Sequence, residues 1–257
     1  MIRAAFFDVD GTLFSHKTKQ IPPSTHAALK ALKEAGILCI ISTGRMIQEM
    51  DRLPMGEVDF DAYITMNGQL TRDGNRQYLD SMPLEGEAKT YALELFCKKE
   101  IPVILVEEDR LYLNFENQRV RDVQNAISSK LPPIGTYEGA PLYQACVYVT
   151  REEEGLLSQV ADMCEISRWH PGGVDMIAKG GGKRTAILRY LEKNGILPEE
   201  IIAFGDGEND IGMLQLAGIG VAMGNAEEVV KQNAHYITAD IDDDGIEKAL
   251  KHLGLIE

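Results

Sequence analysis

The chain has 257 residues, of which 44% are hydrophobic and 26% charged, a composition typical of a folded globular protein with room for two cores. Its net charge of −14, from 26 basic and 40 acidic residues, argues against nucleic acid and anionic membranes as partners, because both require a basic surface. An anionic small substrate remains compatible with this charge, since a bound metal ion can reverse the field inside a pocket.

No apolar run approaches the ~20 residues of a membrane-spanning helix, and the first residues lack a secretory signal pattern. Four scattered cysteines, none in a C-x-x-C pair, are expected to be reduced thiols; they are Cys39, Cys97, Cys146 and Cys164. We therefore expect a cytoplasmic protein that does not bind a membrane. No pattern in the chain specifies an oligomeric state.

Short apolar runs alternate with helical patterns, which is typical of a mostly parallel sheet covered by helices. In the first third of the chain we expect strands over 2–7, 37–42 and 62–66. A helix is expected over 22–35, because Pro22 suits a first helical turn and Gly36 a helix end.

Between residue 82 and about residue 179 the pattern changes. Strands are expected over 103–106, 111–115 and 145–149, with a hairpin between the first two. Helices are expected over 85–99 and 152–164. About a hundred residues suffice for a second α+β domain inserted into the first.

The alternating pattern then resumes, with helices expected over 183–194, 210–217 and 227–233, and strands over 201–204 and 220–223. The fold class we predict is α/β, with a Rossmann-like parallel-sheet core and an inserted α+β domain. The core comprises residues 1–81 and 180–257, and the inserted domain residues 82–179. Ligands of open α/β sheets bind at the carboxyl ends of the strands, and the polar clusters of this chain stand there.

The first polar cluster is Asp8-Val9-Asp10-Gly11-Thr12, directly after the first expected strand. Like charges two residues apart repel, so a cation or a raised pKa must compensate them. By itself such a cluster also fits a turn or a fragment of a calcium loop. The EF-hand pattern is absent, however, because the later ligand positions of that loop lack acidic residues.

The second cluster, residues 205–210, again follows an apolar strand and contributes Asp206 and Asp210. These carboxylates meet Asp8 and Asp10 if the two strands are neighbours, and the resulting all-oxygen site suits Mg²⁺. By itself this cluster also fits a solvated loop that caps a helix at Asn209 or Asp210.

Thr43 and Lys183 are weaker signals singly, since such a threonine is often a cap and such a lysine is often solvated. A hydroxyl and an ammonium that converge on carboxylates and Mg²⁺ nevertheless suit a phosphoryl group in transfer, whose charge is stabilised by positioning and electrostatics.

In this order the residues resemble the haloacid dehalogenase superfamily, and closely its Cof-type sugar-phosphate phosphatases. The matching motifs are Asp8-x-Asp10-Gly11-Thr12, Thr43-Gly44-Arg45, Lys183, and Gly205-Asp206-x-x-Asn209-Asp210. The likeness extends over nearly the whole chain, including residues 66–68 and 221–226. A glycine-rich stretch places Lys179 near Lys183, and Lys183 is preferred because an expected helix follows it.

The resemblance implies a Mg²⁺-dependent phosphatase that hydrolyses a small phosphate monoester, a sugar phosphate in the first place. Asp8 is the implied nucleophile, which forms an aspartyl phosphate, and Asp10 the implied general acid and base. The implied metal site consists of Asp8, Asp206 and the backbone carbonyl of Asp10, with Asp210 as a ligand or a supporting residue. The residues implied to contact the phosphoryl group or substrate are Thr43, Gly44, Arg45, Asn67, Lys183 and Asn209.

The inserted domain resembles the large C2 cap of this superfamily, which covers the active site and favours a small phosphorylated metabolite over a phosphoprotein. Cap residues able to touch a sugar, each equally suited to a structural role, are Tyr112, Asn114, Trp169, His170 and Asp175. Two alternatives stay open at this point: a phosphomutase of the same superfamily, and a non-catalytic protein that senses a phosphorylated metabolite.

Overall fold

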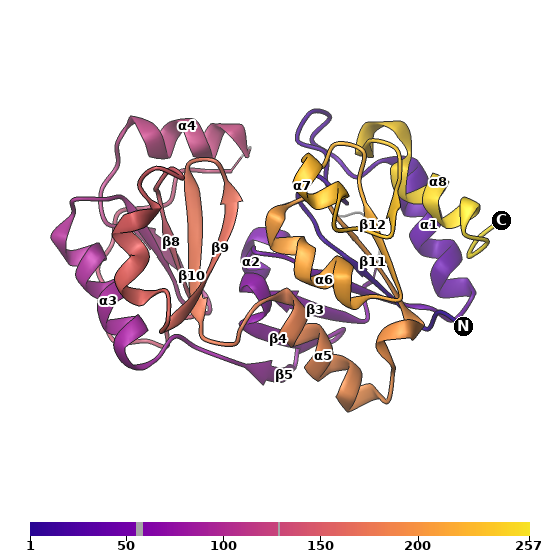
Figure 1. The fold of residues 1–257 in the computed structure, drawn as a ribbon, viewed down its shortest axis with the longest axis horizontal. Coiled ribbons are helices and arrows are strands. Elements are labelled where there is room, and N and C mark those ends of the chain that lie inside the picture. Colours follow the sequence, from indigo (N-terminus) through magenta and orange to yellow (C-terminus); the bar gives the residue numbers. More distant parts are fainter. Residues whose placement is uncertain (55–58, 128) are drawn as a thin grey trace. The chain divides into compact units, whose positions relative to one another are not determined.

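The computed structural model describes residues 1–54, 59–127 and 129–257, which divide into two compact units (Figure 1). Unit 1 contains Met1–Asp80 and Lys183–Glu257, and unit 2 contains Ser81–Gly182. The boundaries expected from the sequence lie after residues 81 and 179. Among the described residues, no helix has the length and apolar character needed to cross a membrane.

Unit 1 is built on an eight-stranded sheet with the order β13-β12-β11-β1-β2-β3-β4-β5. From one edge to the other the strands are β13 (Tyr236–Ile237), β12 (Ile219–Ala222), β11 (Ile201–Gly205), β1 (Ala4–Phe7), β2 (Leu38–Ser42), β3 (Ala62–Thr65), β4 (Leu70–Asp73) and β5 (Tyr78–Ser81). The pairs from β13 to β3 are parallel, and β4 pairs antiparallel with β3. The fold class predicted from the sequence is confirmed.

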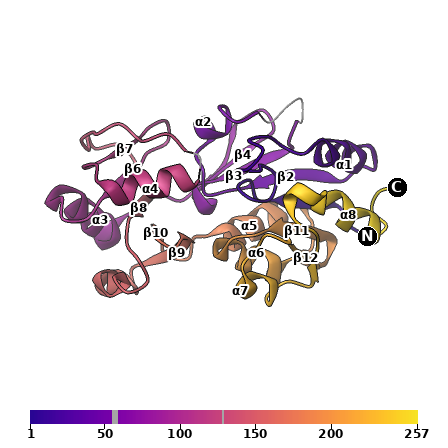
Figure 2. The same ribbon diagram turned by 90° about the horizontal axis from the view of Figure 1, so that it is seen from above.

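Helices cover both faces of this sheet (Figure 2). The helices α1 (Pro23–Glu34) and α8 (Gly245–His252) lie on one face, and α5 (Lys183–Asn194), α6 (Ile211–Leu216) and α7 (Glu228–Lys231) on the other. Strand β1 feeds both cores: Ala5 and Phe7 belong to the first, Ala4 and Phe6 to the second. A strand buried on both faces has a continuous apolar sequence, which explains the run before Asp8.

Short elements complete unit 1. They are α2 (Ile47–Met50) and the 3₁₀ turns Met66–Gly68, Pro198–Glu200, Glu208–Asp210 and Ile241–Asp243. The helix expected over 210–217 is therefore a 3₁₀ turn followed by the shorter α6, and the helix expected over 227–233 contracts to α7.

Unit 2 contains a five-stranded sheet with the order β7-β6-β8-β10-β9, in which every pair is antiparallel. The strands are β7 (Leu111–Leu113), β6 (Val103–Val106), β8 (Gln144–Val147), β10 (Gly173–Ala178) and β9 (Cys164–His170). The expected hairpin is confirmed, because Val106 pairs with Leu111. Helix α3 (Gly86–Lys98) packs on this sheet through Ala88, Ala92 and Phe96, and α4 (Gln118–Ala126) follows β7.

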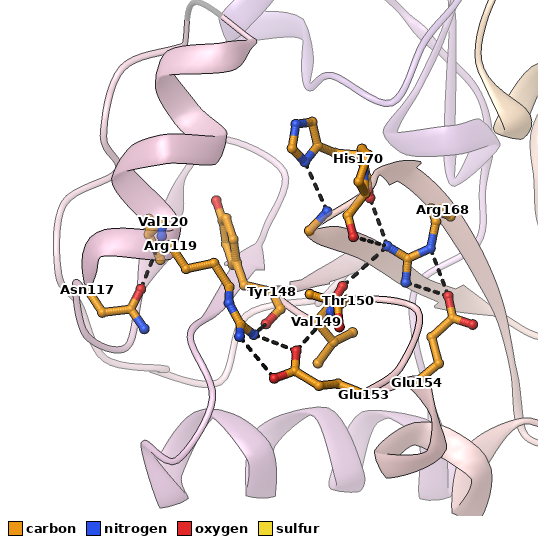
Figure 3. A network of polar contacts seen from close by, with 12 residues as sticks. Asn117, Arg119, Val120, Tyr148, Val149, Thr150, Glu153, Glu154, Arg168 and His170 are labelled. Atoms are coloured by element: carbon orange, nitrogen blue, oxygen red, sulfur yellow. Dashed lines mark hydrogen bonds and ion pairs between the residues drawn. The ribbon is translucent and has the colours of Figure 1, made fainter. Parts of the chain in front are cut away.

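The helix expected over 152–164 is wrong. A 3₁₀ segment spans Glu154–Val160, and Cys164 already begins strand β9. Two acidic residues at the start of the 3₁₀ segment form contacts with other parts of unit 2. Glu153 accepts hydrogen bonds from Arg119 and from the Thr150 amide, and Glu154 pairs with Arg168 (Figure 3). These contacts fix the start of the segment in a tight turn.

Strands β9 and β10 were missed by the sequence prediction, because the alternation of apolar and polar residues in β9 covers only residues 164–167 and ends at Arg168. A bulge between Gly173 and Val174 interrupts their pairing. Arg168, with 8% of its surface exposed, donates to the carbonyl oxygens of Val149, His170 and Pro171 and so ties this hairpin to the end of β8 (Figure 3).

Glycine is required where α6 crosses β12. A Cβ atom at Gly220 would lie 2.1 Å from the backbone oxygen of Leu214. We expect Gly220→Ala to lower the free energy of unfolding by about 2 kcal/mol, because backbone atoms must move to admit the methyl group. Urea denaturation measures this, with Gly155→Ala as the control, since nothing lies within 4 Å of a Cβ there. Equal stability of the two variants would contradict the expectation.

Candidate active site

The parallel register of unit 1 brings several polar segments to one edge of the sheet. Phe7 of β1 pairs with Phe204 of β11 and with Ile41 of β2. The residues that follow these strands therefore lie side by side, as the sequence predicted from neighbouring strands. Asp8 follows β1, Asp206 follows β11, and Thr43 follows β2.

A buried ammonium group links two of the carboxylates at this edge. Lys183 begins α5, and its Nζ donates hydrogen bonds of 2.6 Å to Asp8 Oδ1 and 2.6 Å to Asp210 Oδ1. The lysine is 2% exposed, Asp8 6% and Asp210 0%. Burial alone lowers the pKa of Lys183, but the charges of Asp210 and Asp8 outweigh it and raise this pKa. The lysine is therefore held as a cation.

Carboxylates outnumber cations here. One oxygen each of Asp8, Asp206 and Asp210 lies within 4.8 Å of the others. Burial and the charge of Asp210 raise the pKa of Asp8 to about 7, in spite of Lys183. Burial and the charge of Asp8 likewise raise the pKa of Asp206 well above its ordinary value. Three carboxylates beside one ammonium fit a divalent cation, and an all-oxygen donor set suits Mg²⁺.

The side chain of Asp10 takes no part in this acidic cluster. Arg45 donates to it through Nε (2.6 Å) and Nη2 (2.7 Å), and His16 Nε2 lies 3.1 Å from Oδ1. Burial by itself raises the pKa of Asp10, but hydrogen bonds from His16 and Arg45 outweigh it and lower this pKa to about 2. The guanidinium of Arg45, expected at the substrate, is thus paired with Asp10.

Thr43, Gly44, Asn67 and Asn209 form a second group beside the carboxylates. Thr43 Oγ1 accepts a hydrogen bond from the backbone amide of Arg45, and the backbone amide of Asn67 donates to the Thr43 carbonyl. Asn209 Nδ2 donates to Asn67 Oδ1 at 3.1 Å. A Cβ at Gly44 would lie 3.3 Å from the Asn67 amide nitrogen, so the two segments are packed together.

The turn that carries Asn67 has a left-handed backbone. Met66, Asn67 and Gly68 have φ angles of 51°, 53° and 86°, and all three residues are buried. Asparagine and glycine adopt the left-handed region readily, whereas methionine does not. The conformation of Met66 is therefore unfavourable, and the packing around this buried residue must offset its free energy. Such strained turns concentrate at functional sites, and this one aims the Asn67 amide at Asn209.

The structure separates the two lysines considered from the sequence. Lys183 lies on the carboxylates, whereas Lys179 is in unit 2 and pairs with Glu165 at 3.5 Å.

The cap candidates have structural partners within unit 2. The Tyr112 hydroxyl donates to buried Glu107, and the Asn114 amide bridges the carbonyls of Phe96 and Ile101. Trp169 packs edge-on against Tyr148, Asp175 is buried in β10, and His170 Nδ1 accepts a hydrogen bond from the Gly172 amide (Figure 3). Tyr112 and Asn114 therefore have clear structural roles.

Sequence reasoning missed two residues at this site. His16 and Asn225 lie in loops without a helical or strand pattern, and no motif spacing singled out their side chains. The only available signal for Asn225 was its place in the segment 221–226, which had been noted as a whole. A contact with the distant Gly11 defines the role of Asn225, and a contact with Asp10 in the same loop defines that of His16.

A family model and curated relatives indicate the same family for this chain. A family model described as haloacid dehalogenase-like hydrolase matches residues 5–250. The putative phosphatase YkrA of Bacillus subtilis is 31% identical over 255 residues, covering 98% of each chain. The pyridoxal phosphate phosphatase YbhA of Escherichia coli is 28% identical over 270 residues, covering 95% of this chain and 96% of its own.

Solved structures agree. The subclass IIB sugar phosphatase BT4131 is 38% identical, with a TM-score of 0.86 over 99% of this chain and 100% of its own. The phosphatase BT1666 of Bacteroides thetaiotaomicron is 32% identical, with a TM-score of 0.87 over 100% of this chain and 96% of its own. The chain therefore belongs to the haloacid dehalogenase-like hydrolases, among the Cof-type phosphatases of subclass IIB.

The crowded carboxylates predict how stability depends on pH when a chelator removes divalent cations. The native pKa of Asp8, about 7, exceeds its ordinary value of 3.8. The stabilisation from its bound proton is therefore present below that ordinary value and is lost as the pH rises through about 7. Asp206 shifts in the same direction. In EDTA we expect the free energy of unfolding to fall over this range.

Asp8→Asn is expected to reduce that fall and, at pH 8, to stabilise the metal-free protein by roughly 1–3 kcal/mol, because it removes one of the crowded charges. Urea denaturation across the pH range measures both effects. Exposed Asp122→Asn is the control and is expected to leave the profile unchanged. A wild-type profile in Asp8→Asn would contradict the placement of Asp8 in the cluster.

Proposed function

We propose that this phosphatase uses Mg²⁺ to hydrolyse a small phosphate monoester, a sugar phosphate in the first place, through an aspartyl phosphate on Asp8. The observation that carries the proposal is the pair of 2.6 Å contacts from Lys183 to Asp8 and Asp210, within a cluster of three carboxylates at the carboxyl ends of parallel strands.

Asp8 is the proposed nucleophile. A carboxylate attacks phosphorus only in its ionised form, and Lys183 favours that form by donating to Oδ1. The direct contact also lets Lys183 offset the repulsion between Asp8 and an incoming phosphate.

Asp8, Asp206 and the backbone carbonyl of Asp10 are the proposed Mg²⁺ ligands. When bound, the ion neutralises the crowded carboxylates and stabilises charge on the transferring phosphoryl group. Asp210 acts mainly by positioning: its Oδ1 accepts from Lys183, and its Oδ2 from the amides of Asp206 (3.1 Å) and Gly207 (3.0 Å). Through these contacts it fixes both the lysine and the ligand-bearing loop.

The phosphoryl oxygens are proposed to be bound by Thr43, Lys183 and Asn209. The hydrogen bond between Asn209 and Asn67 orients both amides from different segments. Gly44, Arg45 and Asn67 are the proposed contacts to the rest of the substrate. An amide, a hydroxyl and an ammonium provide donors for the three equatorial oxygens of a phosphoryl group.

Asp10 is the proposed general acid and then the general base. Its ionised state, held by Arg45 and His16, suits activation of water in the second step. To protonate a leaving group it must first lose its pairing with Arg45 and take up a proton from water. Arg45 pairs as readily with phosphate as with carboxylate, so an arriving ester competes for this guanidinium and frees Asp10.

A small phosphorylated metabolite is the proposed partner. Among the similar proteins, BT4131 is a sugar phosphatase and YbhA a pyridoxal phosphate phosphatase, so the class of ester varies among relatives of this identity. The net charge of −14 supports a small ester rather than nucleic acid as the substrate.

A panel of sugar phosphates, sugar-alcohol phosphates and pyridoxal and flavin phosphates tests the substrate class by phosphate release. We expect turnover with Mg²⁺ and at least a ~100-fold loss in EDTA, since the ion stabilises the transferring charge. Release that is unaffected by chelation would overturn the metal assignment. Transfer of the phosphoryl group within the substrate, without release, would identify a mutase.

The aspartyl phosphate is tested with labelled p-nitrophenyl phosphate, whose leaving group needs little protonation. Asp10→Asn should still form the intermediate but hydrolyse it slowly, so acid-quenched protein should carry hydroxylamine-labile phosphate. Asp8→Asn should carry none and lose turnover by ~10³-fold or more, because the nucleophile is gone. Substantial turnover in folded Asp8→Asn protein would contradict the assignment of Asp8 as the nucleophile.

A further inference from the structure

Two segments enclose the carboxylate of Asp206: the end of the motif that begins at Asp8, and the loop after β12. Thr12 Oγ1, fully buried, donates to Asp206 Oδ1 at 2.7 Å. Asn225 Nδ2 lies 3.5 Å from Asp206 Oδ2 and donates to the carbonyl of Gly11 at 2.8 Å. The two oxygens of Asp206 thus face donors on separate loops, one after β1 and one after β12.

Gly11 makes this arrangement possible. A Cβ there would lie 2.2 Å from Asp206 Oδ2, and its φ of 81° is left-handed. The carboxylate therefore rests directly against the backbone of the first motif. The side-chain amide of Asn225 contacts the same peptide segment by donating to the Gly11 carbonyl.

Asn225 is itself held in one orientation. Its Oδ1 accepts a hydrogen bond of 3.0 Å from the Ile241 amide, which directs the NH₂ group toward Gly11 and Asp206. The preceding residue, Gly224, donates its amide to the Ala239 carbonyl, and a Cβ there would lie 2.5 Å from the Asp240 nitrogen. The chain is thus packed tightly on both sides of this side chain.

We propose that Asn225 is a positioning residue for the metal site. Its side-chain amide contacts both the Gly11 peptide and the Asp206 carboxylate, and so fixes the two ligand-bearing loops relative to each other. The oxygen ligands of both loops can then reach the same metal ion. This inference rests on the proposed Mg²⁺ site. Asn225 touches neither substrate nor phosphoryl group in this role, and acts only through Gly11 and Asp206. Partners that orient a ligand in this way typically change metal affinity by about 10–100-fold when they are removed.

A structural role makes a different prediction. If Asn225 served only to attach the loop at Ile241, its loss would lower the stability of the whole unit and leave metal affinity unchanged. Asn233 offers a matched control, since it is also an asparagine of unit 1 whose amide donates to a backbone carbonyl, that of Val229. It also accepts a hydrogen bond from Gln215. None of these contacts involves the acidic cluster.

The experiment is calorimetric titration of the full-length, EDTA-stripped and dialysed protein with MgCl₂ alone, for wild type, Asn225→Ala and Asn233→Ala. We expect Asn225→Ala to raise the Mg²⁺ dissociation constant about 10-fold and Asn233→Ala to leave it within about 2-fold. Thr12→Val, which removes the donor to Asp206 Oδ1 but keeps the side-chain shape, should weaken binding in the same direction.

Phosphate release provides a second readout. In Asn225→Ala, the Mg²⁺ concentration for half-maximal activity should rise as the dissociation constant does, and saturating Mg²⁺ should restore kcat. Unchanged Mg²⁺ affinity in folded Asn225→Ala protein would overturn the inference while leaving the proposed function intact. A wild-type protein that binds no Mg²⁺ would instead overturn the proposed function, and the inference with it.

Discussion

The structure of the site depends on one imbalance: two buried carboxylates and a partly buried one surround a single ammonium group. Lys183 pairs with Asp8 and Asp210, and Asp206 adds a further charge within 4.8 Å. Isolated buried charges are strongly destabilising, so such a cluster requires surrounding structure that fixes it and a bound proton or a further cation that compensates its charge. The fold holds these groups in place. The parallel strands place the acidic residues at one edge of the sheet, and α5 begins at that edge with Lys183.

Close packing between loops, more than the strands themselves, sets the positions of the carboxylates. Gly205 and Gly11 have no Cβ, and a Cβ at either would lie within 2.5 Å of Asp210 or Asp206 atoms respectively. The two glycines thus let side chains of the fourth motif lie against the backbone. Backbone amides and the Thr12 hydroxyl then satisfy carboxylate oxygens that would otherwise be buried without partners. Small residues in both motifs are therefore as necessary as the acidic ones.

Sequence patterns predicted the core elements well, because β1, β2 and β11 are apolar strands buried on both faces and Gly36 and Gly195 mark helix ends. They failed over 152–164, where ion pairs of Glu153 and Glu154 with distant arginines fix a 3₁₀ turn. The motif residues could be named from spacing, but the contacts of His16 and Asn225 could not. Asn225 contacts Gly11, which is far away in the chain, and the pairing of His16 with Asp10 depends on how the loop between them folds, so no local pattern encodes either contact.

The two aspartates of the first motif end in opposite environments although only Val9 separates them. Val9 lies in the hydrophobic core, and the aspartates on either side of it have different partners, Lys183 for Asp8 and Arg45 for Asp10. Burial beside other carboxylates raises the pKa of Asp8, whereas His16 and Arg45 outweigh burial and lower that of Asp10. In the proposed reaction the cation must reverse the first shift, and substrate must relieve the second by drawing Arg45 away. Binding of the cation and the substrate would then give a site with an ionised Asp8 as nucleophile and Asp10 available as the acid. The reaction would therefore require both to be bound.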